Sequence, residues 1–274
     1  MNGIVIAVIV VTVIGLVCGI MLAVASKFMA VPVDERVDQV RECLPGANCG
    51  ACGFAGCDAY AAAIVEDPSI GANKCVPGGA AAAEGIAAVL GIDAGSVEPM
   101  VARLKCNGTC NNTEAKAEWQ GKQTCAGSKL LFGGKNKCSY GCIGFGDCAA
   151  VCPQNAIDVY NGIAHVDPDL CIGCTLCEQT CPMGVISMIP KKAAVALECS
   201  NKDKGKDAMA VCKVSCISCG KCARGCEAGA IEMVDGLPVI DHDKCTGCGK
   251  CAAECPRKCI ADLRANAGVN KAAG

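Results

Sequence analysis

Apolar residues first gather near the N-terminus of this chain. Residues 4–25 contain no charged side chain and are rich in Val and Ile. At about 1.5 Å per residue, a helix of this length crosses the roughly 30 Å of a bilayer's hydrocarbon core. The stretch therefore predicts a transmembrane helix. A second, Ala-rich stretch at 80–90 predicts a shorter helix.

Two later segments alternate between apolar and polar residues, as half-buried β-strands do. The first covers 156–167 around Asn161–Gly162, and the second covers 230–241 around Asp235–Gly236. Asn-Gly and Asp-Gly pairs between alternating runs are strong signals for a β-hairpin. The two segments are 74 residues apart, and the cysteines around them repeat with the same period. The chain therefore contains two related units.

Cysteine is the most unusual feature of the amino-acid composition. The chain has 28 cysteines among 274 residues, while aromatic residues make up only 3%. With so few large side chains, disulfides or bound metal are needed to order the fold. The formal charge of −2 provides no basic field, so we expect no nucleic-acid partner.

The spacing of the cysteines distinguishes bound metal from disulfides. Cys171, Cys174, Cys177 and Cys181, followed by Pro182, form the C-x2-C-x2-C-x3-C-P run of bacterial ferredoxins. Zinc sites also use C-x2-C pairs, but they need neither a third evenly spaced cysteine nor a fourth before proline. Disulfide scaffolds usually have scattered cysteines in short secreted chains. The run therefore favours iron–sulfur clusters.

In such a run three thiolates bind one cluster and the fourth binds the neighbouring cluster. This crossed pattern predicts two sets in the second unit: Cys216, Cys219, Cys222 with Cys255, and Cys226 with Cys245, Cys248, Cys251. In the first unit it predicts Cys152 with Cys171, Cys174, Cys177. The other set of the first unit is irregular, because Phe145 stands where the repeat has Cys219. We expect Cys138 to replace the missing ligand beside Cys142, Cys148 and Cys181.

A further group of cysteines lies nearer the N-terminus. Cys49, Cys52, Cys57 and Cys75 have glycines between them, which allow tight backbone turns around a metal group. We predict a fifth [4Fe-4S] cluster here, with zinc as the alternative metal and Cys43 as an alternative ligand. A sixth cluster would use Cys106, Cys110, Cys125 and either Cys199 or Cys212; otherwise these are free thiols.

These patterns together predict an α+β protein with a single transmembrane helix, a four-cysteine module and two tandem two-cluster ferredoxin-like units. The expected divisions are an anchor at 1–26, the module at 27–97, a connector at 98–137, units at 138–190 and 191–260, and a tail at 261–274. Ala23–Ala25 resembles a signal-peptide cleavage site. No Lys or Arg precedes the apolar stretch, which favours a retained anchor. Lys27, Arg36 and Arg41 follow it and predict a cytoplasmic C-terminal part.

This order of parts resembles the B subunit of the Rnf complex, the ion-translocating ferredoxin:NAD⁺ oxidoreductase of bacterial membranes. The specific features are the module at Cys49, Cys52, Cys57 and Cys75 beside a membrane helix, followed by ferredoxin repeats. Simple members have one two-cluster unit, whereas this chain has two and so resembles the longer clostridial-type forms.

The resemblance implies an electron-transfer subunit of a translocase in the cell membrane. Soluble ferredoxin would be the electron donor, and the membrane and peripheral subunits of the complex would be partners. We expect no catalytic residue, since the chain would only relay electrons. One alternative is a stand-alone membrane-tethered polyferredoxin outside any ion pump. The other is a structural protein held by zinc or disulfides.

Overall fold

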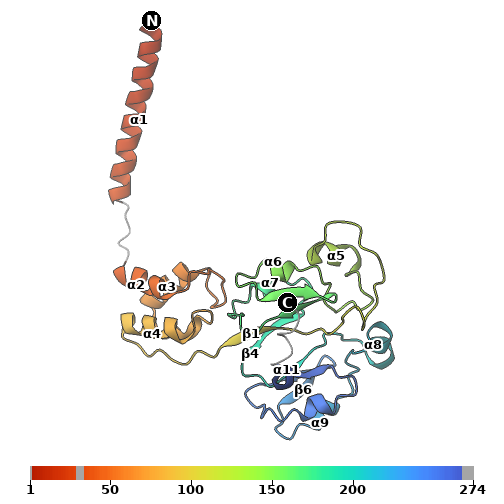
Figure 1. Cartoon of the computed structure of the whole chain (residues 1–274). Coiled ribbons are helices and arrows are strands. Elements are labelled where there is room, and N and C mark those ends of the chain that lie inside the picture. The colour runs from red at the N-terminus through yellow and green to blue at the C-terminus, as the bar shows by residue number, and fades with distance from the viewer. Residues whose placement is uncertain (1, 29–33, 267–274) are drawn as a thin grey trace.

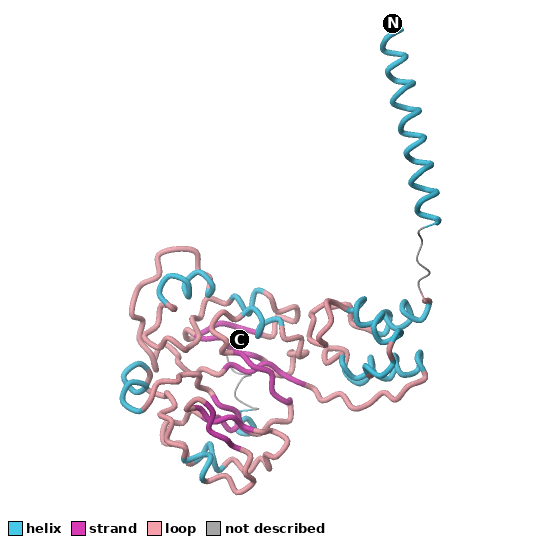
Figure 2. Tube along the Cα trace, turned by 180° about the vertical axis from the view of Figure 1, so that it is seen from behind, coloured by secondary structure: helices cyan, strands magenta, loops and turns pink. Residues whose placement is uncertain are grey.

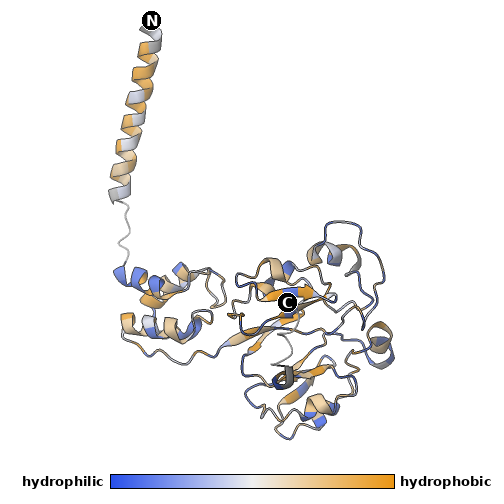
Figure 3. Ribbon diagram, viewed as in Figure 1, coloured by the Kyte–Doolittle hydropathy of each residue, from blue (hydrophilic) through white to orange (hydrophobic). Residues whose placement is uncertain are grey.

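The computed structural model describes residues 2–28 and 34–266, which form an α+β fold (Figure 1). Helix α1 (Asn2–Phe28) contains a span from Val5 to Ser26 with a mean hydropathy of 3.1. No part of this span is buried against the rest of the described chain. Figure 3 shows that apolar residues occur along the length of α1. The predicted apolar helix is present and is long enough to cross a membrane.

Three helices form the module that follows. They are α2 (Glu35–Cys43), α3 (Cys57–Glu66) and α4 (Gly79–Leu90), with two 3₁₀ turns, Pro68–Ile70 and Ala72–Lys74, between α3 and α4. Each helix contributes apolar side chains to a shared core, whose most buried members are Val40, Tyr60, Ala61, Ile64 and Ile86. The predicted Ala-rich helix is therefore present as α4, and it packs against this core.

Each of the two repeated units contains the predicted hairpin. Strands β2 (Ile157–Tyr160) and β3 (Ile163–Val166) pair antiparallel in the first unit. Strands β6 (Ile231–Val234) and β7 (Leu237–Ile240) do so in the second. All four strands have four residues, so each hairpin depends on its surroundings for stability.

Each unit also has a second strand pair, made by segments far apart in sequence. In the first unit β1 (Met100–Leu104) pairs antiparallel with β4 (Ile186–Pro190). In the second, β5 (Val195–Leu197) pairs antiparallel with β8 (Ile260–Asp262). Strand β1 lies in the segment that we expected to be a connector, and the structure includes it in the first unit. Its short run of apolar residues is stabilised by pairing with β4, which local periodicity does not reveal.

Short helices connect the strands. Helix α6 (Asp147–Ala150) contacts α7 (Leu176–Thr180) in the first unit, and α9 (Lys221–Arg224) contacts α10 (Lys250–Ala253) in the second. Three further helices lie outside these pairs: α5 (Cys125–Phe132), α8 (Gly205–Val211) and α11 (Leu263–Asn266). Figure 2 shows that the strands cluster in the centre of the two units, with loops around them.

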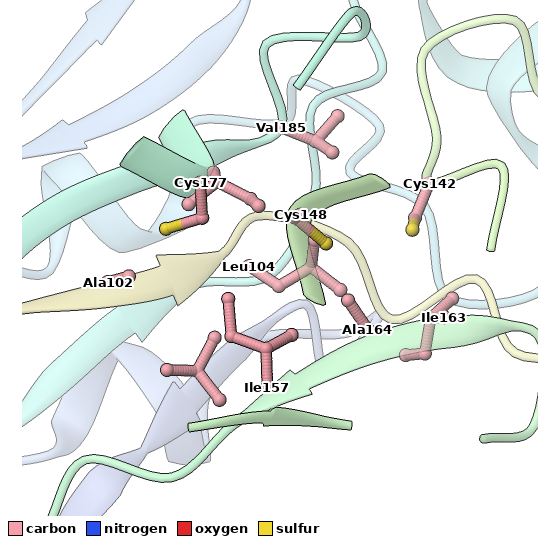
Figure 4. Close-up of a cluster of buried hydrophobic side chains, with 11 residues drawn as sticks. Ala102, Leu104, Cys142, Cys148, Ile157, Ile163, Ala164, Cys177 and Val185 are labelled. Atoms are coloured by element: carbon pink, nitrogen blue, oxygen red, sulfur yellow. The ribbon is translucent and has the colours of Figure 1, made fainter. Parts of the chain in front are cut away.

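Cysteine side chains lie within the apolar cores. In the first unit Leu104, Ile157 and Val185 are buried together with the thiols of Cys148 and Cys177 (Figure 4). The strand pairs and the short helices thus converge on sulfur atoms. Cysteines that we predict to be cluster ligands in this unit are therefore also core residues.

One glycine in the first unit permits a close backbone contact. Gly144 has φ +79°, and a Cβ there would lie 2.2 Å from the carbonyl oxygen of Gly162 in the hairpin turn. Gly184 has a similar φ of +62° with no atom within 4 Å of such a Cβ. We expect Gly144→Ala to lower the free energy of unfolding by about 2–4 kcal/mol, from left-handed strain plus overpacking. Gly184→Ala should cost only about 1–2 kcal/mol, from the strain alone.

Anaerobic denaturant unfolding of the detergent-solubilised chain measures both variants. Equal losses for the two substitutions would contradict the contact between the loop of Gly144 and the hairpin turn.

Candidate metal centres

The module brings its four predicted cysteines together. The thiol of Cys75 interacts electrostatically with those of Cys49, Cys52 and Cys57, and burial is the main cause of its raised pKa. Helix α3 begins at Cys57, where the amide nitrogen donates to Asn48 Oδ1 at 2.8 Å. Cys75 follows the second 3₁₀ turn. The helix start and the turn therefore present thiols to one space.

Three regular sets occur in the ferredoxin-like units. Cys177 interacts with Cys152, Cys171 and Cys174 in the first unit. In the second unit Cys226, Cys245, Cys248 and Cys251 line one cavity of about 300 Å³. Cys222 interacts with Cys216 and Cys219, and Cys255 joins them through Cys259, which contacts both Cys216 and Cys255. The structure therefore places together the thiols that the crossed pattern assigns to each set, and their binding of clusters stays a prediction.

The irregular set differs from the prediction. Cys125, and not Cys138, lines a cavity with Cys142, Cys148 and Cys181. The Asp147 carboxylate explains this position, because it accepts hydrogen bonds from the amide nitrogens of Cys125 at 3.0 Å and of Ala126 at 3.1 Å. The start of α5 is thereby attached next to α6, which carries Cys148.

Phe145, which stands in the place of a ligand, faces other partners. Its ring lies 6.4 Å from the Trp119 ring, and Lys135 Nζ lies 4.5 Å from its centroid. The 74-residue period could have indicated Cys125, because Phe145 leaves one position of the set without a thiol.

Cys138 belongs to a different group, which bridges the two units. Together with Cys106, Cys199 and Cys212 it lines an enclosed cavity of about 20 Å³. The expected sixth set included Cys106 and either Cys199 or Cys212, but the structure adds Cys138 and leaves out Cys110 and Cys125. None of the four belongs to a complete ferredoxin run, so only the tertiary structure brings them together. We call Cys106, Cys138, Cys199 and Cys212 the bridging set.

The remaining cysteines outside the six sets lie elsewhere. Cys110 is exposed, and its amide nitrogen donates to the carbonyl oxygen of Asn161 at 2.9 Å. Cys43, which was an alternative ligand of the module, ends α2 and donates to the Gln39 carbonyl oxygen at 3.3 Å. Cys18 is exposed on α1. Cys259 contacts Cys216 and Cys255, which belong to one set of the second unit.

The donor chemistry of the sets fits iron–sulfur clusters. Each set consists of four thiols, the number that a [4Fe-4S] cluster needs, and three of the sets line cavities. Backbone amides also donate to sulfur, as in Ala156 to Cys152 at 3.3 Å and Ala230 to Cys226 at 3.4 Å. Such hydrogen bonds stabilise a thiolate ligand and tune the potential of a bound cluster.

Burial strongly affects several of these thiols. It raises the pKa of Cys106 to about 12, of Cys148 to about 12 and of Cys177 to about 11. A thiol with a raised pKa keeps its proton at neutral pH, and metal binding must displace that proton. Iron binding at these positions should therefore weaken as the pH falls.

Neighbouring sets lie close to one another. Cys174 in the first unit interacts electrostatically with Cys49 of the module. The amide nitrogen of Cys142 donates to Cys106 Sγ at 3.3 Å, and that of Cys216 donates to Cys199 Sγ at 3.2 Å. The bridging set thus touches one set of each unit, and the module touches the first unit.

Family models match the same regions. One described as an Fe-S cluster matches residues 44–77. A 4Fe-4S dicluster domain matches residues 137–185 and 215–259, and a second dicluster model matches residues 170–231. The matches cover the module and both units.

Similar proteins extend over most of the chain. The B subunit of the Na(+)-translocating ferredoxin:NAD(+) oxidoreductase complex of Acetobacterium woodii is 42% identical over 95% of this chain and 78% of the relative. The proton-translocating counterpart of Clostridium ljungdahlii is 41% identical, over 88% and 85%. The B subunit of the ion-translocating oxidoreductase complex of Methanosarcina acetivorans is 38% identical, over 90% and 93%.

Contact between the module and the first unit depends on Gly173. Its φ is +71°, and a Cβ there would lie 2.7 Å from the Met100 carbonyl oxygen and 3.0 Å from the Val76 side chain. We expect Gly173→Ala to loosen the module, so that thermolysin cleaves the connection at 91–99 several-fold faster. Gly247 has the same φ, but a Cβ there would meet only side-chain atoms, the Ala194 methyl group at 3.1 Å and Arg264 Nη1 at 4.0 Å, so Gly247→Ala is the matched control. Equal cleavage of both variants would contradict this role.

Proposed function

The chain belongs to the family of B subunits of ion-translocating ferredoxin:NAD(+) oxidoreductase complexes, and from this premise we propose the course of electron transfer through it. It is an electron-transfer subunit of a translocase, in which reduced ferredoxin donates electrons and other subunits of the complex accept them. The observation that carries the proposal is the contact between successive cysteine sets, because electrons can pass between redox groups only over short distances.

Six [4Fe-4S] clusters are proposed, one for each set of four thiols. Two sets differ from those expected from the sequence: Cys125 with Cys142, Cys148, Cys181, and the bridging set. Each bound cluster would supply one-electron redox chemistry. The protein's own residues would hold the clusters in order, shield them from water and adjust their potentials through amide hydrogen bonds to sulfur.

The order of the sites follows from their contacts. The path begins at the set of Cys248, continues to the set of Cys216, and crosses the bridging set into the first unit. There it passes from the set of Cys142 to that of Cys174, and finally reaches the module through Cys49. Hydrogen bonds at Cys216–Cys199 and Cys142–Cys106 support the two junctions of the bridging set, and the electrostatic interaction of Cys174 with Cys49 supports the junction with the module. The two junctions within the units rest on the crossed ligand pattern of the ferredoxin runs.

Ferredoxin would donate its electrons at the second unit. Cys219 and Cys248 are the exposed thiols of that unit, and the cavity beside Cys248 has a volume of about 300 Å³, whereas the bridging cavity has a volume of about 20 Å³. The module would be the exit, since it directly follows α1 in the chain. In this proposal α1 stays in the cell membrane and the remainder of the chain lies in the cytoplasm.

Cutting the path at the bridging set tests the relay. We expect Cys212→Ala to lower ferredoxin-dependent NAD⁺ reduction by the assembled complex at least tenfold, because the two units lose their connection. Reduction of the clusters in the second unit by ferredoxin, followed by EPR, should persist. Cys110→Ala, at an exposed cysteine outside every set, should change neither measurement. Full turnover in the Cys212→Ala complex would refute the proposed path.

A rescue experiment tests the ligands of the irregular set. Phe145 matches Cys219 in the repeat, so Phe145→Cys should restore a regular ligand at this site. We expect Cys125→Ala to lose about four iron atoms per chain and Cys125→Ala/Phe145→Cys to recover them. Cys138→Ala should lose a similar amount without recovery by Phe145→Cys, because Cys138 belongs to the bridging set. Recovery of the Cys138 variant instead would favour the set expected from the sequence.

A further inference from the structure

Five thiols, and not four, meet at one site in the second unit. Cys216, Cys219, Cys222 and Cys255 provide a complete ligand set for this site. Cys259 Sγ lies only 3.5 Å from Cys255 Sγ, and the Cys259 side chain also contacts Cys216. Cys259 is 3% exposed and packs with Cys199 and Cys216 in one core cluster. The site therefore has one more thiol than a [4Fe-4S] cluster needs.

The position of Cys259 follows from the repeated motif. The residue four places after the last cysteine of each run is buried in all four cases: Ala156, Val185, Ala230 and Cys259. At Ala156 and Ala230 the amide nitrogen of this residue donates to the sulfur of the cysteine four places earlier. The motif thus holds this residue next to a ligand sulfur. Only at Cys259 does the residue itself have a thiol.

The backbone at Cys259 is firmly held. Its carbonyl oxygen accepts a hydrogen bond from the Glu198 amide nitrogen at 2.7 Å, and the next residue, Ile260, begins β8 paired with β5. The Cα–Cβ bond of Cys259 therefore has a fixed direction. Rotation about χ1 is the remaining freedom of this side chain, and its sulfur lies 3.5 Å from that of Cys255.

We propose that Cys259 is a reserve ligand for the iron atom that Cys255 binds. This rests on the proposed function, because it requires a cluster at this site. In the exchange the Cys259 thiol gives up its proton and binds iron, while the Cys255 thiolate leaves and takes up a proton; no electron is transferred. The site adjoins the bridging set through Cys216 and Cys199, so keeping its cluster keeps the two units connected.

Iron and sulfide analysis of anaerobically purified full-length variants tests the exchange. Cys255→Ala should keep the iron content of the wild type, and so should Cys259→Ala. The double variant Cys255→Ala/Cys259→Ala should lose about four iron atoms per chain. EPR spectra of the reduced proteins should show the loss of one cluster signal in the double variant alone.

The first unit offers a matched control. Cys181 corresponds to Cys255, but Val185 stands in the place of Cys259. Cys181→Ala should therefore lose about four iron atoms, and Cys181→Ala/Val185→Cys should regain them. These two variants of the first unit also test the reserve role if Cys255→Ala does not fold. In that case, failure of Cys181→Ala/Val185→Cys to regain iron would overturn the proposal.

The iron content distinguishes a failure of the reserve role of Cys259 from a failure of the proposed function. A Cys255→Ala variant that folds and loses as much iron as the double variant would overturn the reserve role of Cys259, while the clusters themselves would stand. A wild-type protein without iron and sulfide would instead overturn the proposed function.

Discussion

The grouping of cysteine thiols in sets of four, several of them buried, is the constraint on which the rest of this structure depends. In the first unit the thiols of Cys142, Cys148 and Cys177 lie within the same core as Leu104 and Ile157. In the second, one core cluster consists of Cys199, Cys216 and Cys259. A chain with 3% aromatic residues has few large side chains to bury, so we expect metal binding and folding to be coupled in each unit. Hairpins with four-residue strands can persist because they are held between such sets.

In the proposed relay, the bridging set connects the two repeated units. Each unit by itself holds two sets that share a crossed pair of runs, which is enough for a two-cluster ferredoxin. Cys138 and Cys212 are equivalent positions of the repeat, yet both contribute to the same site. Duplication therefore provided thiols at matching positions, and the packing of the units against each other made a new site from them. This contact is what makes transfer between the units reasonable on physical grounds.

The two units also show how a repeat can diverge without losing a site. In the second unit Cys219 completes the set of Cys216, which leaves Cys199 free for the bridging set. In the first unit Phe145 replaces that cysteine, and Cys125, the equivalent of Cys199, completes the set of Cys142 instead. Asp147 holds Cys125 in this position, because its carboxylate accepts hydrogen bonds from the first amide groups of α5. The second unit has Lys221 at that position, which cannot accept these hydrogen bonds.

Local sequence patterns were enough to predict the class of protein, the apolar helix and the two hairpins, and they predict the cysteine groupings with regular spacing. These features are local, because the structure of a ferredoxin run, an Asn-Gly turn or an apolar stretch depends mainly on residues that are close together in the sequence. Tertiary structure decided the pairing of β1 with β4, the place of Cys125 and the bridging set. Cys106 and Cys212 are far apart in the chain, and no spacing rule links them. Their meeting depends on how two folded units pack, which is a property of whole surfaces and not of any short segment.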